Sequence, residues 1–278
     1  MSVTPLPPRE LPIGVFDSGV GGLTVVRALM ERLPFENIIY FGDTARVPYG
    51  IKSVPTIENF TGQITDFLLA SKVKMLIIAC NTMAAVARHV VDEKAAAFGI
   101  PVLDVIDSGA SEAARLSRSG HIGVIGTPTT VNSNAYARRI HSIAPGARVF
   151  TQACPLFVPL VEEGWLDHAV TRLTAQEYLR PVLAEHVDTL VLGCTHYPLL
   201  KPLLRAVISE AGESVCLIDS AITVAEQAAR ELTRSGLAHS GQTPTVIKYY
   251  VTDVPLRFQT IGERFLGRTL GQVEKASF

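Results

Sequence analysis

The sequence lacks the features that would place it in a membrane, outside the cell or on a nucleic acid. No window reaches the roughly 18 consecutive apolar residues of a membrane span. Residues 1–12 contain four prolines and no apolar run as long as that of a signal peptide. The 25 basic and 26 acidic side chains nearly cancel, so no charge excess favours nucleic acid or an anionic bilayer. We therefore expect a cytoplasmic protein that binds a small polar ligand.

Cysteine is scarce, and the usual cofactor motifs are missing. The four cysteines stand far apart, and none belongs to a Cys-x-x-Cys pair. This spacing argues against a disulfide framework and against a zinc site, so we expect no metal. The glycines of residues 17–22 do not follow Gly-x-Gly-x-x-Gly, and no Gly-x-x-x-x-Gly-Lys-Ser/Thr occurs. Neither the dinucleotide fingerprint nor the P-loop is therefore present.

Two segments, residues 73–82 and 187–196, repeat one pattern. Each is an apolar run of strand length that ends in a small residue, a cysteine and two hydrogen-bonding side chains. The two endings are Cys80-Asn81-Thr82 and Cys194-Thr195-His196. Runs that are apolar throughout are typical of parallel strands buried on both faces, and ligands bind beyond the carboxyl ends of such strands. We therefore predict that both thiols face a ligand site.

Strand and helix patterns alternate along the chain, which predicts an α/β fold with mainly parallel, doubly wound sheets. The order of elements begins again at Ile122, where residues 122–127 resemble residues 13–18. The spacing between corresponding segments, including the two cysteines, is nearly constant. This internal duplication predicts two similar lobes related by a pseudo-two-fold axis, with the active site in the cleft between them.

The expected lobe boundaries follow from the duplication. The second lobe is predicted to comprise residues 107–218. The first is predicted to be discontinuous, with residues 1–106 and 219–278, because the tail strand at residues 245–252 lies outside the repeat and should return to the first sheet. Residues 1–12 are predicted to form a loose arm, since proline blocks regular hydrogen bonding there.

The chemistry of the two strand-end cysteines depends on their neighbours. A thiol becomes a base or nucleophile when nearby groups lower its pKa or accept its proton, and the adjacent hydroxyl, amide and imidazole groups could fix a carboxylate or relay a proton. Of the other cysteines, Cys216 is predicted to be a buried apolar residue, and Cys154 stays open between a structural and a functional role. Asp17 could be a turn or cap residue or a carboxylate aimed into the cleft, and Glu162 alone would read as a surface charge.

Several longer segments resemble the glutamate racemases of the aspartate/glutamate racemase superfamily. They run in family order and are residues 16–23, 40–50, 79–82, 154–162 and 193–198. The resemblance implies a cofactor-independent interconversion of L- and D-glutamate that supplies D-glutamate to bacterial peptidoglycan. In that family one cysteine thiolate removes the α-proton from one face and the other thiol protonates the opposite face.

Carried over residue by residue, the resemblance assigns the two acid–base roles to Cys80 and Cys194, with Asp17, His196 and Glu162 assisting them. The substrate contacts that it implies are Asp17, Ser18, Tyr49, Gly50, Asn81, Thr82, Thr195 and His196. It also implies a homodimer. Three alternatives remain: a racemase specific for aspartate, a relative that needs one thiol such as a decarboxylase, and a non-catalytic binding module with two α/β lobes.

Overall fold

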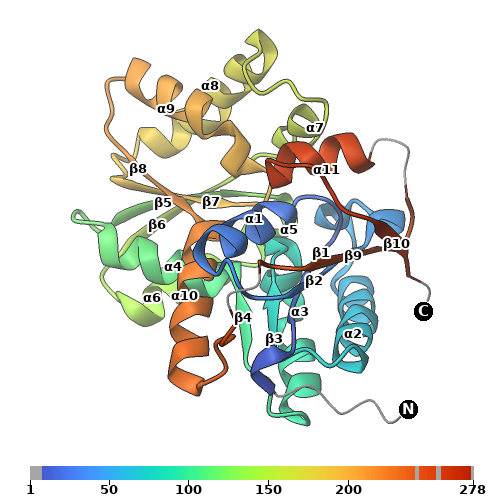
Figure 1. Ribbon diagram of the computed structural model, residues 1–278. Coiled ribbons are helices and arrows are strands. Elements are labelled where there is room, and N and C mark those ends of the chain that lie inside the picture. Colours follow the sequence, from blue (N-terminus) through green and yellow to red (C-terminus); the bar gives the residue numbers. More distant parts are fainter. Residues whose placement is uncertain (1–7, 242–243, 255–257, 277–278) are drawn as a thin grey trace, which may run out of the picture.

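Two separate parallel sheets organise the chain in the computed structural model, which describes residues 8–241, 244–254 and 258–276 (Figure 1). The strands of the first sheet are β1 (Ile13–Asp17), β2 (Ile38–Gly42), β3 (Met75–Ile78), β4 (Val102–Asp104), β9 (Ile247–Val251) and β10 (Val273–Lys275). Those of the second sheet are β5 (His121–Gly126), β6 (Arg148–Ala153), β7 (Thr189–Gly193) and β8 (Cys216–Asp219). The strand orders are β10-β9-β2-β1-β3-β4 and β6-β5-β7-β8, and each strand pairs with its neighbours in parallel. The predicted parallel α/β architecture is confirmed.

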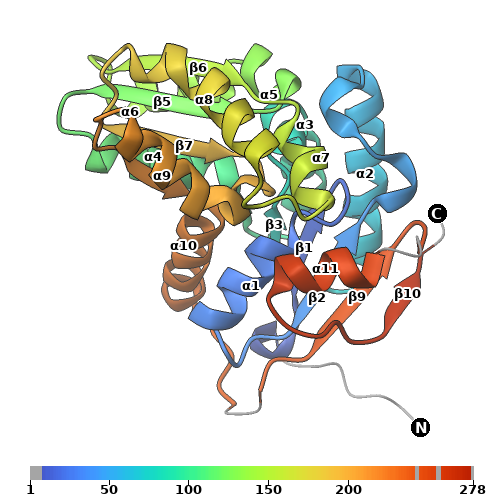
Figure 2. The same cartoon turned by 90° about the horizontal axis from the view of Figure 1, so that it is seen from above.

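Helices connect the strands and cover the sheets. The α-helices are α1 (Leu23–Arg32), α2 (Val54–Ala70), α3 (Asn81–Ala96), α4 (Val105–Leu116), α5 (Pro128–Asn132), α6 (Ala135–Ile143), α7 (Phe157–Glu162), α8 (Ala169–Leu183), α9 (Lys201–Glu210), α10 (Ser220–Ser235) and α11 (Phe258–Leu266). Short 3-10 helices are η1 (Pro8–Glu10), η2 (Thr44–Arg46), η3 (Tyr49–Ile51) and η4 (Tyr197–Leu200). Helices α1 and α11 lie on one face of the first sheet and α2 and α3 on the other (Figure 2), so β1, β2 and β3 are buried along their whole length.

The two sheets repeat one arrangement, as the sequence predicts. Both contain the order second–first–third–fourth strand, β2-β1-β3-β4 and β6-β5-β7-β8. Ile13 is paired with Met75 and Ile122 with Thr189, and Cys80 follows Met75 by the same number of residues as Cys194 follows Thr189. The two cysteines therefore occupy equivalent positions beyond the carboxyl ends of β3 and β7.

Two helices carry the chain between the sheets. Helix α4 leads from β4 to the second sheet, α10 leads back from β8, and the two pack against each other. Each begins at an aspartate that ends a strand: Asp104 accepts hydrogen bonds from two backbone N–H groups of α4, and Asp219 accepts one from α10. Such capping satisfies donors that a helix start leaves free. Strand β9 then pairs with β2, so the tail returns to the first sheet as predicted.

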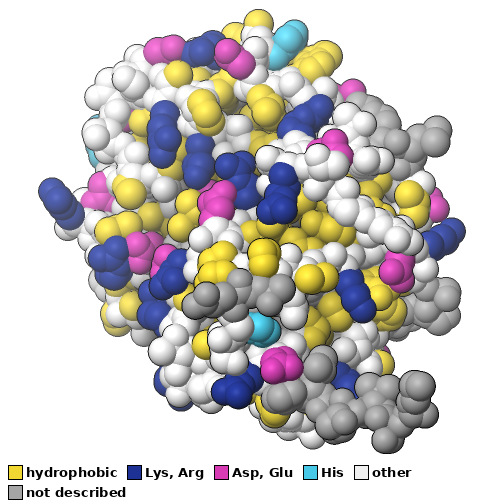
Figure 3. All heavy atoms as spheres, in the orientation of Figure 1, with side chains coloured by type: hydrophobic (Ala, Val, Ile, Leu, Met, Phe, Trp, Pro, Cys, Tyr) yellow, Lys and Arg dark blue, Asp and Glu magenta, His cyan; other side chains and the backbone are white. Residues whose placement is uncertain are grey.

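The surface mixes charges of both signs. On the face shown in Figure 3, Lys and Arg side chains are interspersed with Asp and Glu side chains and with apolar ones. Ion pairs also link separate elements of the fold, such as Arg32 of α1 with Glu226 of α10, at 2.9 Å. Within the described residues, no helix has both the length and the apolar content that crossing a bilayer would need.

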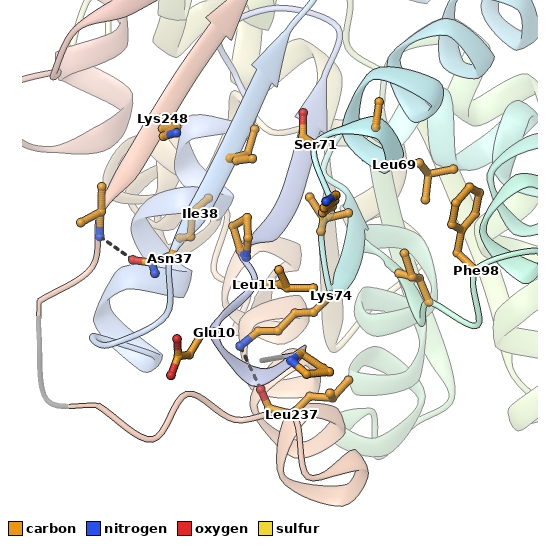
Figure 4. Close-up of a pocket in the computed structure, with 18 of the residues that line it drawn as sticks. Glu10, Leu11, Asn37, Ile38, Leu69, Ser71, Lys74, Phe98, Leu237 and Lys248 are labelled. Atoms are coloured by element: carbon orange, nitrogen blue, oxygen red, sulfur yellow. Dashed lines mark hydrogen bonds between the residues drawn. The ribbon is translucent and has the colours of Figure 1, made fainter. Parts of the chain in front are cut away.

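A buried lysine ties several segments together at the amino ends of the first-sheet strands. The Nζ atom of Lys74, just before β3, donates a hydrogen bond to the carbonyl of Arg9 at 2.6 Å. It donates a second to the carbonyl of Leu237 at 2.9 Å (Figure 4). It also pairs with Glu36 at 2.5 Å, and both side chains are almost fully buried. The prediction of a loose arm is therefore wrong from Pro8 onward, where η1 forms and the Arg9 carbonyl is bound. Residues 1–7 lie outside the described residues.

The substitution Lys74→Met tests this anchor. It leaves Glu36 buried without its cation, so we expect the free energy of unfolding to fall by about 3–5 kcal/mol, measured by urea denaturation. The control is Lys94→Met, which removes a more exposed lysine paired with Asp66 at 2.8 Å and should cost less than about 1 kcal/mol. Equal, small losses in both variants would contradict a stabilising role for the buried pair.

Candidate active site

A cavity of about 430 Å³ lies beyond the carboxyl ends of β1, β3, β5 and β7, and both halves of the chain line it. The lining includes nearly all the residues that the sequence singled out, which are Ser18, Tyr49, Gly50, Cys80, Asn81, Thr82, Glu162, Cys194, Thr195 and His196. A larger hollow of about 1090 Å³ lies at the opposite end of the first sheet, around Lys74 (Figure 4), and no cysteine lines it. The smaller of these two cavities therefore holds the candidate catalytic side chains.

Cys80 stands in the first half of this cavity, at the N-cap of α3. It is buried, and its Sγ donates a weak hydrogen bond to Ser18 Oγ at 3.4 Å. Burial raises the pKa of the Cys80 thiol to about 12, and the charge of Asp17 adds to this rise. Hydrogen bonds to Ser18 and to a backbone N–H of α3 act in the opposite direction. Cys80 is therefore a protonated thiol at neutral pH.

Asp17 lies behind the cavity and is not among the residues that line it. Its side chain is buried, with Oδ1 accepting from the backbone N–H of Gly19 at 2.9 Å and Oδ2 from Thr195 Oγ1 at 3.4 Å. Burial raises the pKa of Asp17 more than the positive charge of His196 lowers it. The structure therefore puts Asp17 in contact with cavity residues rather than with the cavity itself.

In the second half, Cys194, His196 and Glu162 form a chain of contacts. The Sγ of Cys194 is 3.8 Å from Nδ1 of His196, and Nε2 of His196 is 2.9 Å from Oε1 of Glu162. Burial alone lowers the pKa of His196, but the hydrogen bonds and electrostatic interactions with Cys194 and Glu162 raise it to about 10. The imidazole is therefore cationic at neutral pH, and it can stabilise a negative sulfur beside it.

The two halves touch through the turn that follows β1. A Cβ atom at Gly21 would lie 2.2 Å from Thr195 Oγ1 and 2.6 Å from His196 Nδ1, so only glycine lets the turn approach these residues. Thr24 Oγ1 also donates to the carbonyl of Thr195 at 3.1 Å. The turn after β1 in the first half thus packs directly against Thr195 and His196 of the second half.

The loop that carries Tyr49 is held by a buried aspartate. Asp43 accepts hydrogen bonds from the Tyr49 hydroxyl and from Thr252 Oγ1, and pairs with Arg46 at 2.7 Å. Burial, followed by the charge of Asp43, raises the pKa of Tyr49. Tyr49 thus lines the cavity while its hydroxyl is bound to Asp43.

Two residues that the sequence analysis missed complete the lining and its support. Thr127 lines the cavity and its Oγ1 is 3.0 Å from Oγ1 of Thr82. Thr127 corresponds to Ser18 in the internal repeat, which is the signal that could have identified it. Tyr136 of α6 donates from its hydroxyl to Asn81 Oδ1 at 2.7 Å, and nothing in the local sequence pointed to this contact. The Nδ2 atom of Asn81 is buried and has no hydrogen-bond partner among the described residues.

The remaining cysteines lie outside the cavity lining. Cys216 is exposed, so the prediction of a buried residue is wrong. It is the first residue of β8, which among the described strands is an edge strand paired with β7. Cys154 is buried after β6, and its carbonyl accepts from the Tyr197 hydroxyl at 2.8 Å. Over residues 8–241, 244–254 and 258–276, no cluster of three His, Cys, Asp or Glu residues is arranged to hold a metal ion.

Comparison with known proteins agrees with this geometry. The model of the Asp/Glu/Hydantoin racemase family matches residues 13–228. A glutamate racemase of Syntrophus aciditrophicus is 66% identical over 268 residues, which are 96% of this chain and 97% of that protein. A glutamate racemase of Neisseria gonorrhoeae is 62% identical over 269 residues, 97% of each.

A solved structure agrees over nearly the whole fold. The crystal structure of glutamate racemase from Francisella tularensis in complex with D-glutamate is similar to this chain with a TM-score of 0.90 and 43% identity, over 97% of this chain and 98% of that one. Since the family match spans most of the chain, and close relatives cover nearly all of it, the chain belongs to the Asp/Glu/hydantoin racemase family, a family of isomerases, and groups within it with the glutamate racemases.

Proposed function

We propose that this chain interconverts L- and D-glutamate without a cofactor, with Cys80 and Cys194 as the acid–base pair. The observation that carries the proposal is that two cysteines at equivalent strand ends line one cavity. The relatives named above as glutamate racemases, and the D-glutamate in the Francisella structure, support glutamate as the substrate. Aspartate is the competing substrate within the superfamily.

Racemisation needs an acid and a base on opposite sides of one carbon. One sulfur takes the α-proton as the Cα–H bond breaks, and the other thiol gives its proton to the opposite face of the resulting carbanion. The number of protons on the two sulfurs is unchanged, but their distribution is exchanged. Because the α-proton is very weakly acidic, the site must also stabilise the carbanion with preorganised donors. The unpaired Nδ2 of Asn81 and the hydroxyl of Thr82 are the donors that we assign to the substrate. Thr195, whose hydroxyl donates to Asp17, offers the substrate an acceptor oxygen.

The two sulfurs have opposite electrostatic surroundings, which suggests how each half-reaction starts. Cys80 is a protonated thiol beside the buried Asp17, with its pKa raised to about 12 by burial and that charge. Cys194 lies beside the cationic imidazole of His196. We assign Cys194 as the base and Cys80 as the acid when substrate binds the free protein. After one turnover Cys194 carries the proton and Cys80 does not, which is the state needed to convert the product enantiomer back. We propose that His196 and Asp17 assist the return of the proton to Cys80.

Further parts of the proposal concern the setting of the reaction. We propose that the product enters peptidoglycan synthesis in the cytoplasm and that the protein acts as a homodimer. We also propose that residues 1–106 with 219–278, and residues 107–218, form two lobes that enclose the substrate by closing, which would exclude water from the carbanion. The return of β9 and β10 to the first sheet supports this division.

A deuterium-exchange assay tests the activity. Purified protein incubated with L-glutamate in deuterated water, with no cofactor added, should give D-glutamate and deuterium at Cα. The same assay with L-aspartate should show much slower exchange. Faster turnover of aspartate would reverse the assignment of substrate, and tight binding of glutamate without exchange at Cα would indicate a binding module instead.

Replacing either sulfur tests the acid–base pair. We expect Cys80→Ser and Cys194→Ser each to lower kcat for racemisation by at least about 10³-fold, because a serine hydroxyl is a far weaker acid than a thiol and cannot act as the base at neutral pH. Chiral chromatography of the product measures the effect. The control, Cys216→Ala, removes the exposed thiol of β8 and should keep most of the activity. Full activity in either serine variant would overturn the two-thiol mechanism.

Removing the Glu162 carboxylate tests the charge state of His196. The negative charge and the 2.9 Å contact favour the cationic imidazole, so Glu162→Gln should lower the pKa of His196 from about 10. Activity that requires the cation should then fall at a lower pH than in the wild type, as seen in the alkaline limb of the kcat–pH profile. Glu177→Gln, which removes an exposed carboxylate paired with Arg180 on α8, is the control. An unchanged alkaline limb in Glu162→Gln would show that this contact does not set the charge of His196.

A further inference from the structure

Helix α11 joins the two halves of the molecule near the active site. It follows β9 and packs closely on α1, where a Cβ atom at Gly262 would lie 3.1 Å from Leu23 Cδ1. Both views place it beside α7, which carries Glu162 in the second half (Figures 1 and 2). Helix α11 thus packs on the first half of the molecule, and side chains at its end contact the second half.

Arg264 of α11 binds the end of α7. Its Nη1 atom donates hydrogen bonds to the carbonyls of Val161 at 3.1 Å and Glu162 at 3.0 Å. These carbonyls lie at the carboxyl end of a helix, where a cation is favoured. The next turn makes room for the guanidinium: Gly164 has a φ of +80°, and a Cβ atom there would lie 2.8 Å from Arg264 Nη2. The contact therefore holds the backbone from which the Glu162 side chain extends.

Phe265, the next residue, packs on the partner of Glu162. Its side chain is buried, and its ring meets the His196 ring edge to face, with centroids 4.9 Å apart and planes at 79°. This is within the range of favourable aromatic pairs. Two adjacent residues of α11 therefore contact the two partners of one hydrogen bond, which joins Nε2 of His196 and Oε1 of Glu162 at 2.9 Å.

We infer that Arg264 and Phe265 are positioning residues for this site, which hold Glu162 and His196 in the register that their hydrogen bond requires. Neither residue lines the cavity, so both act through the pair and not on the substrate. The catalytic consequence rests on the proposed function, because it concerns the imidazole beside Cys194. The structural consequence, a contact between Glu162 and His196 that depends on α11, does not.

The first test follows His196 itself by NMR titration of protein labelled with ¹⁵N in histidine. The charged or titratable groups that act on this imidazole are Cys194, Glu162 and, through its charge, Asp17. The Arg264 guanidinium lies near them at the end of α7. In Arg264→Met we expect the His196 pKa to fall, because loosening α7 weakens the Glu162 contact that favours the cation. A purely electrostatic effect has the opposite sign, since losing a nearby positive charge raises the pKa. An unchanged or higher pKa would overturn the inference.

The second test is kinetic and uses matched variants. A small displacement of a supporting group can cost about 10²-fold in rate, so Arg264→Met should lower kcat by up to this factor with little change in KM. Arg264→Lys keeps a donor and a charge and should recover part of the loss. Arg268→Met removes an exposed arginine just beyond α11 and should leave kcat near the wild-type value. Equal losses in Arg264→Met and Arg268→Met would overturn the inference.

Phe265 is tested by Phe265→Leu, which keeps an apolar side chain in the buried position while removing the aromatic ring that packs against His196. The expected result is a lower His196 pKa and a lower kcat, with urea denaturation confirming a folded protein. A folded Phe265→Leu variant with wild-type His196 pKa and kcat would contradict the role of the ring.

Failure of the proposed function and failure of this inference give different results. A wild-type protein that does not racemise glutamate refutes the proposed function. An active wild-type protein whose His196 pKa is the same in Arg264→Met refutes only the inference.

Discussion

The site depends on the way in which parallel strands end. In both sheets the strand that leads to a cysteine is paired on both sides, β3 between β1 and β4 and β7 between β5 and β8. Backbone hydrogen bonds on two sides fix where such a strand stops, and the chain must then leave the sheet at its carboxyl edge. Cys80 and Cys194 stand at that point, so their positions are set by strands that are paired on both sides.

Equivalent positions in the two sheets carry unequal charges, so the two thiols have different electrostatic surroundings. When the two sheets are aligned by their strand pairing, Asp17 of the first half corresponds to Gly126 of the second, and Thr82 corresponds to His196. A carboxylate therefore accompanies the first thiol and an imidazolium the second. The fold supplies two similar backbones, and a few differences at corresponding positions give the two thiols neighbours of opposite charge.

Contacts between distant parts of the chain stabilise the first half and join the two halves around the cavity. At the end away from the site, Lys74 binds Glu36 and the carbonyls of two other segments. Near the site, the turn at Gly21 packs on Thr195 and His196, and Arg264 binds α7. In each contact the two partners come from segments far apart in the sequence. The contact therefore forms only when the chain is folded.

The order of the elements, the parallel sheets, the duplication and the two strand-end thiols were all determined by the local sequence, because apolar runs, glycine turns and helical periodicity are short-range patterns. The positions of Asp17 behind the cavity, of Cys216 on an exposed edge and of the Tyr49 hydroxyl on Asp43 were decided only by the tertiary structure. The same holds for Tyr136 beside Asn81 and for Arg264 and Phe265 beside Glu162 and His196. These depend on which surfaces meet after folding, and burial and contact between residues far apart in the chain leave no periodic signal in the segments that make them.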